Sequence, residues 1–116
     1  MARVQIPVSQ IVRGAGLAQP AQTNGDHTNN HYFANDGRTF LEVVSSDAGS
    51  QTVAFEIPTP SSGTDGQSVT SLSVTVAAGA TRYVGPFPTA IYNQTDQTVF
   101  VDPSVSTTLK FRAYKI

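Results

Sequence analysis

Two histidines and their acidic neighbours are the residues best placed to bind a metal ion. His27 and His31 are four positions apart, and Asp26 and Asp36 lie close to them in the sequence. This spacing brings two imidazoles to one face only in a helix, and the surrounding Asn, Thr and Gly residues disfavour a helix. A mobile loop would hold the ligands too loosely for a defined site. We therefore expect solvated loop residues here, with no metal site and no cofactor.

Glu42 and Glu56 are the carboxylates whose positions would suit acid–base catalysis. If their strands were adjacent, opposed Cβ atoms would lie about 5 Å apart, close to the carboxyl separation of a retaining glycosidase. Nothing around them suggests a cleft, so two exposed residues on a polar face are the simpler interpretation. The chain also has no cysteine, no Ser-His-Asp set, no P-loop and no dinucleotide fingerprint. The sequence therefore predicts no catalytic residue and a protein that is not an enzyme.

The residues from Arg38 to Ile116 consist of short alternating segments separated by Gly, Pro, Ser and Asp. Val53, Phe55 and Ile57 share one face because side chains on a strand alternate with a period of two. Strands spaced about ten residues apart are typical of an all-β, antiparallel β-sandwich, Ig-like or jelly-roll-like. The expected strands are Thr39–Ser45, Gln51–Ile57, Val69–Val76, Thr81–Val84, Thr98–Asp102 and Thr108–Lys115. The expected core is Leu41, Val43, Val53, Phe55, Ile57, Leu72, Val74, Val76, Val99, Val101, Leu109 and Phe111.

Three local patterns refine this arrangement. Residues 45–50 (SSDAGS) are expected to join the first two strands as a hairpin. Residues 40–44 (FLEVV) are apolar on both faces, which favours a central strand. Phe87 lies between Pro86 and Pro88, and we expect it to fix the chain where it crosses between the sheets.

Residues 1–37 are expected to form an irregular N-terminal arm or long loop beside a body formed by residues 38–116. Val4, Ile6 and Val8 alternate, but the intervening proline cannot donate to a strand ladder, which favours an edge strand or an extended arm. Such an arm could add to a neighbour's sheet. The alternative is that this segment completes the chain's own sandwich.

The polar run 22–30 follows, and its composition cannot bury enough apolar surface to order itself. Tyr32 and Phe33 come directly after the run, and we expect them to anchor it on the body. More than 20 residues without regular structure are unusual in a compact domain. This region is therefore expected to be a functional loop or to lie on a partner.

The charge content is low, and the charges are unevenly placed. Charged residues make up 13% of the chain and its net charge is -1, which argues against nucleic-acid binding. A surface low in charge is poorly protected against association, so we expect other protein to cover part of it. The last strand carries Lys110, Arg112 and Lys115. They could balance acidic residues within the sheet or attract an acidic face of another subunit.

No apolar run approaches the roughly 20 residues of a membrane span, and the first residues lack a secretory signal. We therefore expect no membrane partner and synthesis in a cytoplasm. Exposed tyrosines on a sandwich face could stack on sugars, although the tryptophan usual in such sites is absent.

Four segments are distinctive in their turns and core positions: Ala2–Val8, Asn30–Val43, Ala78–Pro88 and Val99–Ser104. Together they resemble small virion structural proteins of tailed bacteriophages that infect actinobacteria. The resemblance covers nearly the whole chain. It implies a β-sandwich, and the family includes head decoration (cement) proteins. Its motifs are turns and core positions, so no catalytic residue is implied.

The resemblance implies a non-enzymatic decoration protein on the outer surface of a capsid, bound to the major capsid protein and to copies of itself. Such a protein would be synthesised in the host bacterial cytoplasm and would be located in the virion. The alternatives are a tail or head–tail connector protein and a carbohydrate-binding surface module. The expected partner contacts are Val4, Ile6, Val8, Tyr32, Phe33, Lys110, Arg112 and Lys115.

Overall fold

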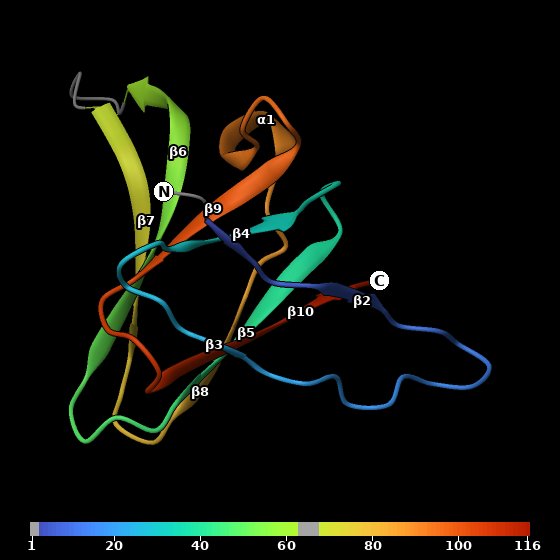
Figure 1. The fold of residues 1–116 in the computed structure, drawn as a ribbon. Coiled ribbons are helices and arrows are strands. Elements are labelled where there is room, and N and C mark those ends of the chain that lie inside the picture. Colours follow the sequence, from blue (N-terminus) through green and yellow to red (C-terminus); the bar gives the residue numbers. More distant parts are fainter. Residues whose placement is uncertain (1–2, 63–67) are drawn as a thin grey trace.

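In the part of the chain that the structure describes, ten strands form two mixed sheets that pack face to face as a sandwich, with one short helix beside them (Figure 1). The computed structural model describes the backbone of residues 3–62 and 68–116 and the side chains of residues 3–58 and 71–116. The elements are β1 (Val4–Gln5), β2 (Val8–Gln10), β3 (Thr23–Asn24), β4 (His31–Ala34), β5 (Thr39–Ser45), β6 (Gln51–Ser62), β7 (Ser68–Val76), β8 (Thr81–Val84), α1 (Thr89–Tyr92), β9 (Thr98–Pro103) and β10 (Leu109–Lys115).

The first sheet, sheet A, has the strand order β1-β4-β9-β6-β7, and the second, sheet B, has the order β2-β10-β5-β8 with β3 also paired to β10. Most neighbours are antiparallel, but β1 runs parallel to β4 and β2 runs parallel to β10. The expectation of a purely antiparallel sandwich is therefore wrong at these two pairs. Both involve N-terminal strands that lie beside strands distant in the sequence, a pairing that local patterns do not encode.

The central and crossing elements match the sequence patterns closely. Strands β5 and β8 have the expected bounds, and β5 lies between β10 and β8 as an internal strand. Phe87 is 1% exposed and lies between β8 of sheet B and β9 of sheet A, which confirms its place at a crossing. Its ring packs against Phe33 and Phe55, so it contributes to the core.

The expected hairpin between β5 and β6 is wrong. The two strands belong to different sheets, so residues 46–50 cross from sheet B to sheet A. The turn residues indicated a tight connection correctly, but they do not determine whether the next strand pairs with the last or packs across from it.

The core lies between the sheets and contains most of the expected residues. Those confirmed as buried are Leu41, Val43, Val53, Phe55, Ile57, Val76, Val99, Val101, Leu109 and Phe111. Two expected members differ: Leu72 is 37% exposed and Val74 is only partly buried. Both lie on β7, the edge strand of sheet A, where side chains have a neighbouring strand on one side only.

The N-terminal segment is part of the sandwich, which differs from the expected arm. The Ile6 amide donates to the Tyr32 carbonyl at 2.8 Å, and the Ile6 side chain is 0% exposed in the core. The chain then crosses at Pro7 from sheet A to sheet B, where β2 pairs with β10 (Figure 1). Pro7 falls between the two strands, so its missing N–H costs no ladder bond. Residues 3–10 and 31–37 therefore belong to the body.

Candidate functional site

The residues between β2 and β3, Ile11–Gln22, leave the sandwich as a projecting loop (Figure 1). Both flanking strands pair with β10, so the base of this projecting loop is fixed. A turn near its tip is closed by the Gly16 amide, which donates to the Val12 carbonyl at 2.9 Å. The irregular structure expected for residues 1–37 is present in this part.

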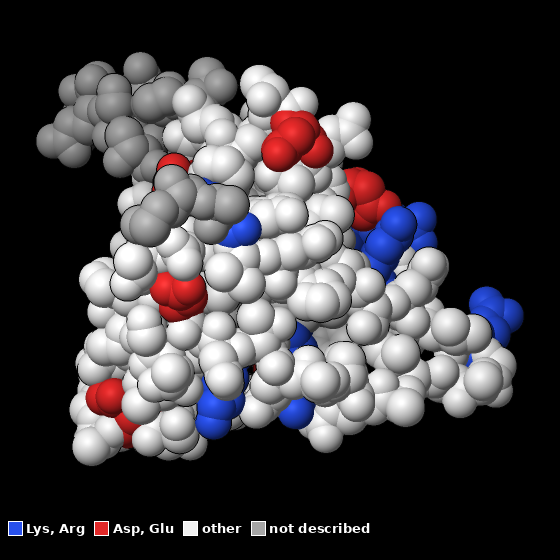
Figure 2. Space-filling view, in the orientation of Figure 1, with Lys and Arg blue, Asp and Glu red and all other residues white. Residues whose placement is uncertain are grey.

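The projecting loop carries apolar side chains into solvent. Ile11, Val12 and Leu17 are 42%, 52% and 38% exposed. Arg13 is the only charged residue of the loop. Figure 2 shows basic side chains at the right-hand end of the molecule, the end at which Figure 1 draws the loop. Exposed apolar surface can mark an interaction site, and three such side chains lie within seven residues of this loop. The projecting loop is therefore the first candidate for partner binding.

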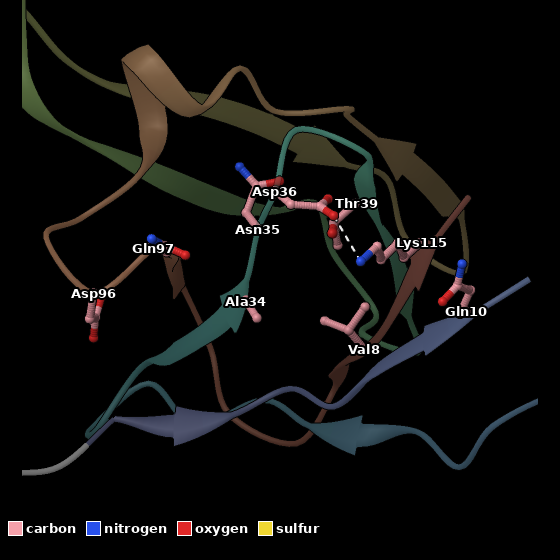
Figure 3. Close-up of a pocket in the computed structure, with 9 residues that line it drawn as sticks. All are labelled: Val8, Gln10, Ala34, Asn35, Asp36, Thr39, Asp96, Gln97 and Lys115. Atoms are coloured by element: carbon pink, nitrogen blue, oxygen red, sulfur yellow. Dashed lines mark ion pairs between the residues drawn. The ribbon is translucent and has the colours of Figure 1, made fainter.

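A pocket of about 420 Å³ lies at the base of the projecting loop (Figure 3). Val8 and Ala34 line its apolar part, and Gln10, the residue before the loop, lies at its rim. Lys115 forms an ion pair with Asp36 across the rim at 2.8 Å, and this hydrogen bond holds the pKa of Asp36 below its usual range. The pocket therefore combines apolar and charged side chains, and Gln10 is the lining residue nearest in the chain to the projecting loop.

Two of the sequence-predicted contact residues are in the core. Ile6 and Phe33 are fully buried and cannot reach a partner in the folded chain. Val4 is exposed, Tyr32 is half-buried, and Val8 is half-buried beside the pocket. The alternation pattern shows which residues share a face of the strand. In the N-terminal segment, the face that contains Ile6 points toward the chain's own core.

The basic residues of β10 are largely neutralised within the chain. Arg112 donates to Glu42 at 2.6 Å and to the Pro20 carbonyl at 2.8 Å. The Tyr83 hydroxyl donates to the same carboxylate at 2.8 Å, which raises the pKa of Tyr83. Lys115 is paired with Asp36. This geometry favours the interpretation of balanced charges within the sheet over attraction between subunits.

Glu42 and Glu56 do not form the carboxylate pair considered above, because they lie in different sheets. The Glu56 carboxylate instead accepts a hydrogen bond from the Arg3 guanidinium at 2.6 Å, and the same guanidinium donates to Asp102 at 2.7 Å. Its hydrogen bond with Asp102, aided by burial, raises the pKa of Glu56. The cluster joins β1 to β6 and β9, so its effect is structural.

Arg3 partly covers the aromatic side chains considered above for sugar binding. Tyr32 and Phe100 face each other across β4 and β9 and line a shallow depression with Arg3 and Asp96. The Arg3 guanidinium lies 3.9 Å from the centre of the Phe100 ring. A sugar could therefore stack on this face of Phe100 only after Arg3 moved.

His27 and His31 have different environments and do not act together. His31 is buried and hydrogen-bonded through both ring nitrogens, and its ring centre lies 5.1 Å from that of Phe111 at a tilt of 59°. His27 is exposed, with Nδ1 2.8 Å from the Pro103 carbonyl oxygen. The expectation of solvated loop residues is therefore wrong for His31. Among the described residues, no group of three His, Cys, Asp or Glu side chains could hold a metal.

Comparison with families of known proteins, with curated proteins and with solved structures found no match to this chain. In the described part of the chain, no helix has the length and apolar character needed to cross a membrane. The sequence analysis placed residues 1–37 on a partner but did not name Ile11, Val12 or Leu17 as contact residues, although the apolar residues of IVRGAGL among glycines were a visible signal.

Proposed function

We propose that this chain is a non-enzymatic virion structural protein that decorates a bacteriophage capsid by binding the outer surface of the major capsid protein shell. Copies of the chain also contact one another in this proposal. In this proposal the two-sheet sandwich is Ig-like or jelly-roll-like, and jelly rolls are common in viral capsid domains. The resemblance of the four sequence segments supports the class of protein.

The observation that carries the proposal is the projecting loop with Ile11, Val12 and Leu17 exposed. The loop is anchored at both ends on β10, so it presents these side chains from a rigid base. Burying one such side chain contributes about 1.5–3 kcal/mol, so three of them could supply much of the binding free energy. A rigid body with an apolar projection is suited to attachment to another protein.

The first test measures attachment of the full chain to particles that contain the major capsid protein but lack this chain. Replacing Ile11, Val12 and Leu17 with Ser should weaken co-sedimentation at least tenfold, because the apolar contacts are lost. The matched control is Ile91→Ser, which removes a side chain of similar exposure (43%) on α1. Undiminished binding by the triple variant, with the control unchanged, would show that the projecting loop is not the attachment site.

A second measurement distinguishes decoration from the alternatives. Quantitative gel densitometry of purified particles should give hundreds of copies for a decoration protein and about a dozen or fewer for a tail or connector protein, because their symmetries differ. A copy number in the lower range would replace the capsid role with a tail or connector role. Binding on a glycan array that is lost in Tyr32→Ala would instead support a carbohydrate-binding module.

A further inference from the structure

Strand β7 (Ser68–Val76) is an unusually open sheet edge. Within the described residues it pairs with β6 on one side and with no strand on the other. An edge strand leaves alternate backbone N–H and C=O groups without ladder partners, and natural proteins guard such edges with lysine, proline or short length. The nine residues of β7, SVTSLSVTV, contain no charge and no proline. The other edge strands, β1, β2 and β8, have two, three and four residues.

The side chains at this edge also have incomplete cover. Leu72 and Val74 alternate on the same face as the buried Val76, yet Leu72 is 37% exposed and Val74 is only partly buried. A further strand beside β7 would supply the missing neighbour on the open side. The edge therefore lacks both backbone partners and apolar cover.

We propose that β7 pairs antiparallel with β7 of a second copy, across a two-fold axis at Leu72, so that sheet A continues through both molecules. Leu72 is the midpoint of the strand, so this register gives the longest overlap. It places Leu72 opposite Leu72 of the second copy and Ser71 opposite Ser73 of the second copy. Directly opposed residues share a face in an antiparallel pair, so Leu72 meets Leu72 at the axis, while Val74 lies opposite Thr70 and Val76 opposite Ser68 of the second copy.

The choice of a second copy follows from the charge pattern. Like charges directly opposite one another destabilise a strand pair, and any charged residue near the centre of the strand would therefore oppose self-pairing. The uncharged sequence of β7 carries no such penalty. A two-fold contact uses the same surface on both molecules, which is the commonest symmetry of soluble oligomers. This inference deepens the self-contact included in the proposed function, but it rests on the strand itself.

The test uses the full chain in analytical ultracentrifugation over a range of concentrations. The wild type should form a species with twice the mass of one chain. Leu72→Lys and Leu72→Glu should each weaken self-association at least tenfold, because like charges would face each other at the axis. An equimolar mixture of the two variants should recover a heterodimer, because opposite charges then face each other.

The matched control is Leu17→Lys, which adds the same charge at a side chain of nearly equal exposure, 38% against 37%. Leu17→Lys should leave self-association unchanged and weaken particle attachment. Leu72→Lys should weaken self-association and leave particle attachment unchanged if attachment needs only one copy. The two measurements therefore distinguish failure of the self-association proposal from failure of the attachment proposal.

Hydrogen exchange of the wild type provides a measurement that does not depend on how the variants fold. Amides of residues 71–75 should become more protected as concentration rises, while those of β8 should not. A wild type that stays monomeric to roughly millimolar concentration, or a dimer that neither charge variant weakens, would overturn the proposal.

Discussion

His31 is held in one tautomer by two backbone groups. The Asp26 amide donates to Nε2 at 2.8 Å, so Nε2 must be unprotonated, and Nδ1 then donates to the Val4 carbonyl at 3.1 Å. A proton on Nε2 would face that amide and break its hydrogen bond. Burial is the main cause that lowers the pKa of His31 from its ordinary value of 6.5; nearby Arg3 also lowers it, whereas Asp26 and Asp102 raise it. The ring therefore accepts the hydrogen bond of the Asp26 amide only while it is neutral, whereas its bond to the Val4 carbonyl persists in either state.

This arrangement predicts a pH dependence of stability. Because the folded state binds the proton less readily than the unfolded chain, the stabilisation is complete above the unfolded pKa of about 6.5 and declines as pH falls below it. Urea unfolding at pH 7.5 and pH 5.5 should show this loss in the wild type and a smaller one in His31→Gln. His27→Gln, at the exposed histidine, should keep the wild-type dependence. An equal loss in His31→Gln and the wild type would contradict the role given to His31.

Burial at single positions was predicted most reliably where both neighbours of a strand are present. Alternation placed Phe55 and Phe111 in the core correctly, because their strands are internal. It placed Leu72 there too, but an edge strand leaves it partly uncovered. For the candidate site, alternation could not show whether Ile6 faces a partner or its own core, because that depends on pairing with distant strands.

The segment that contains β1 and β2 is an integral element, which leads to a prediction about the core. Ile6→Ala should lower the free energy of unfolding by about 2–5 kcal/mol, because it removes a fully buried side chain from between the sheets. Val4→Ala, at an exposed position on the same segment, should change it by less than about 1 kcal/mol. Chemical denaturation of both variants measures the difference.

Deletion of residues 2–12 tests the same element as a whole. It removes β1, β2 and the Arg3 ion pairs with Glu56 and Asp102, so the isolated chain should lose its cooperative thermal transition. A deletion variant that still melts cooperatively would show that the segment is a dispensable arm, as the sequence first suggested.

Elements were predictable where the signal is local. Strands β5 and β8 have turn residues at both ends, and their bounds were correct. The missed strands are β1, β2, β3 and β4, which are short. Strands β2 and β3 pair with β10, β4 pairs with β9 and β1 pairs with β4, so their stability depends on partners far along the chain. The polar run before β4 gave no local sign of this pairing, because its order comes from backbone bonds and the buried His31.

At the scale of the whole molecule, one folded body carries the projecting loop with its exposed apolar side chains. Buried residues of both sheets form one cluster, and His31 of sheet A packs against Phe111 of sheet B. The two sheets therefore share one core and should unfold together. The projecting loop Ile11–Gln22 is different, because its side chains are almost all exposed and few backbone bonds hold it. Exposed loops of this kind are where proteases cut first.

Limited digestion with trypsin should therefore cut the free chain first after Arg13, the only basic residue in the projecting loop. The fragment of residues 1–13 should remain bound to the rest, because Ile6 is buried in the core and β1 and β2 are paired in both sheets. Mass spectrometry of a time course identifies the first cut, and gel filtration without denaturant tests whether the fragments co-elute.

Arg13→Gln should slow the first cleavage strongly, and attachment to particles should protect the loop in the wild type if the proposed function is right. A first cut after Arg38 or Arg82, or prompt release of the short fragment, would mean that the projecting loop is not the weak point of the fold and that the N-terminal strands are not integral to it.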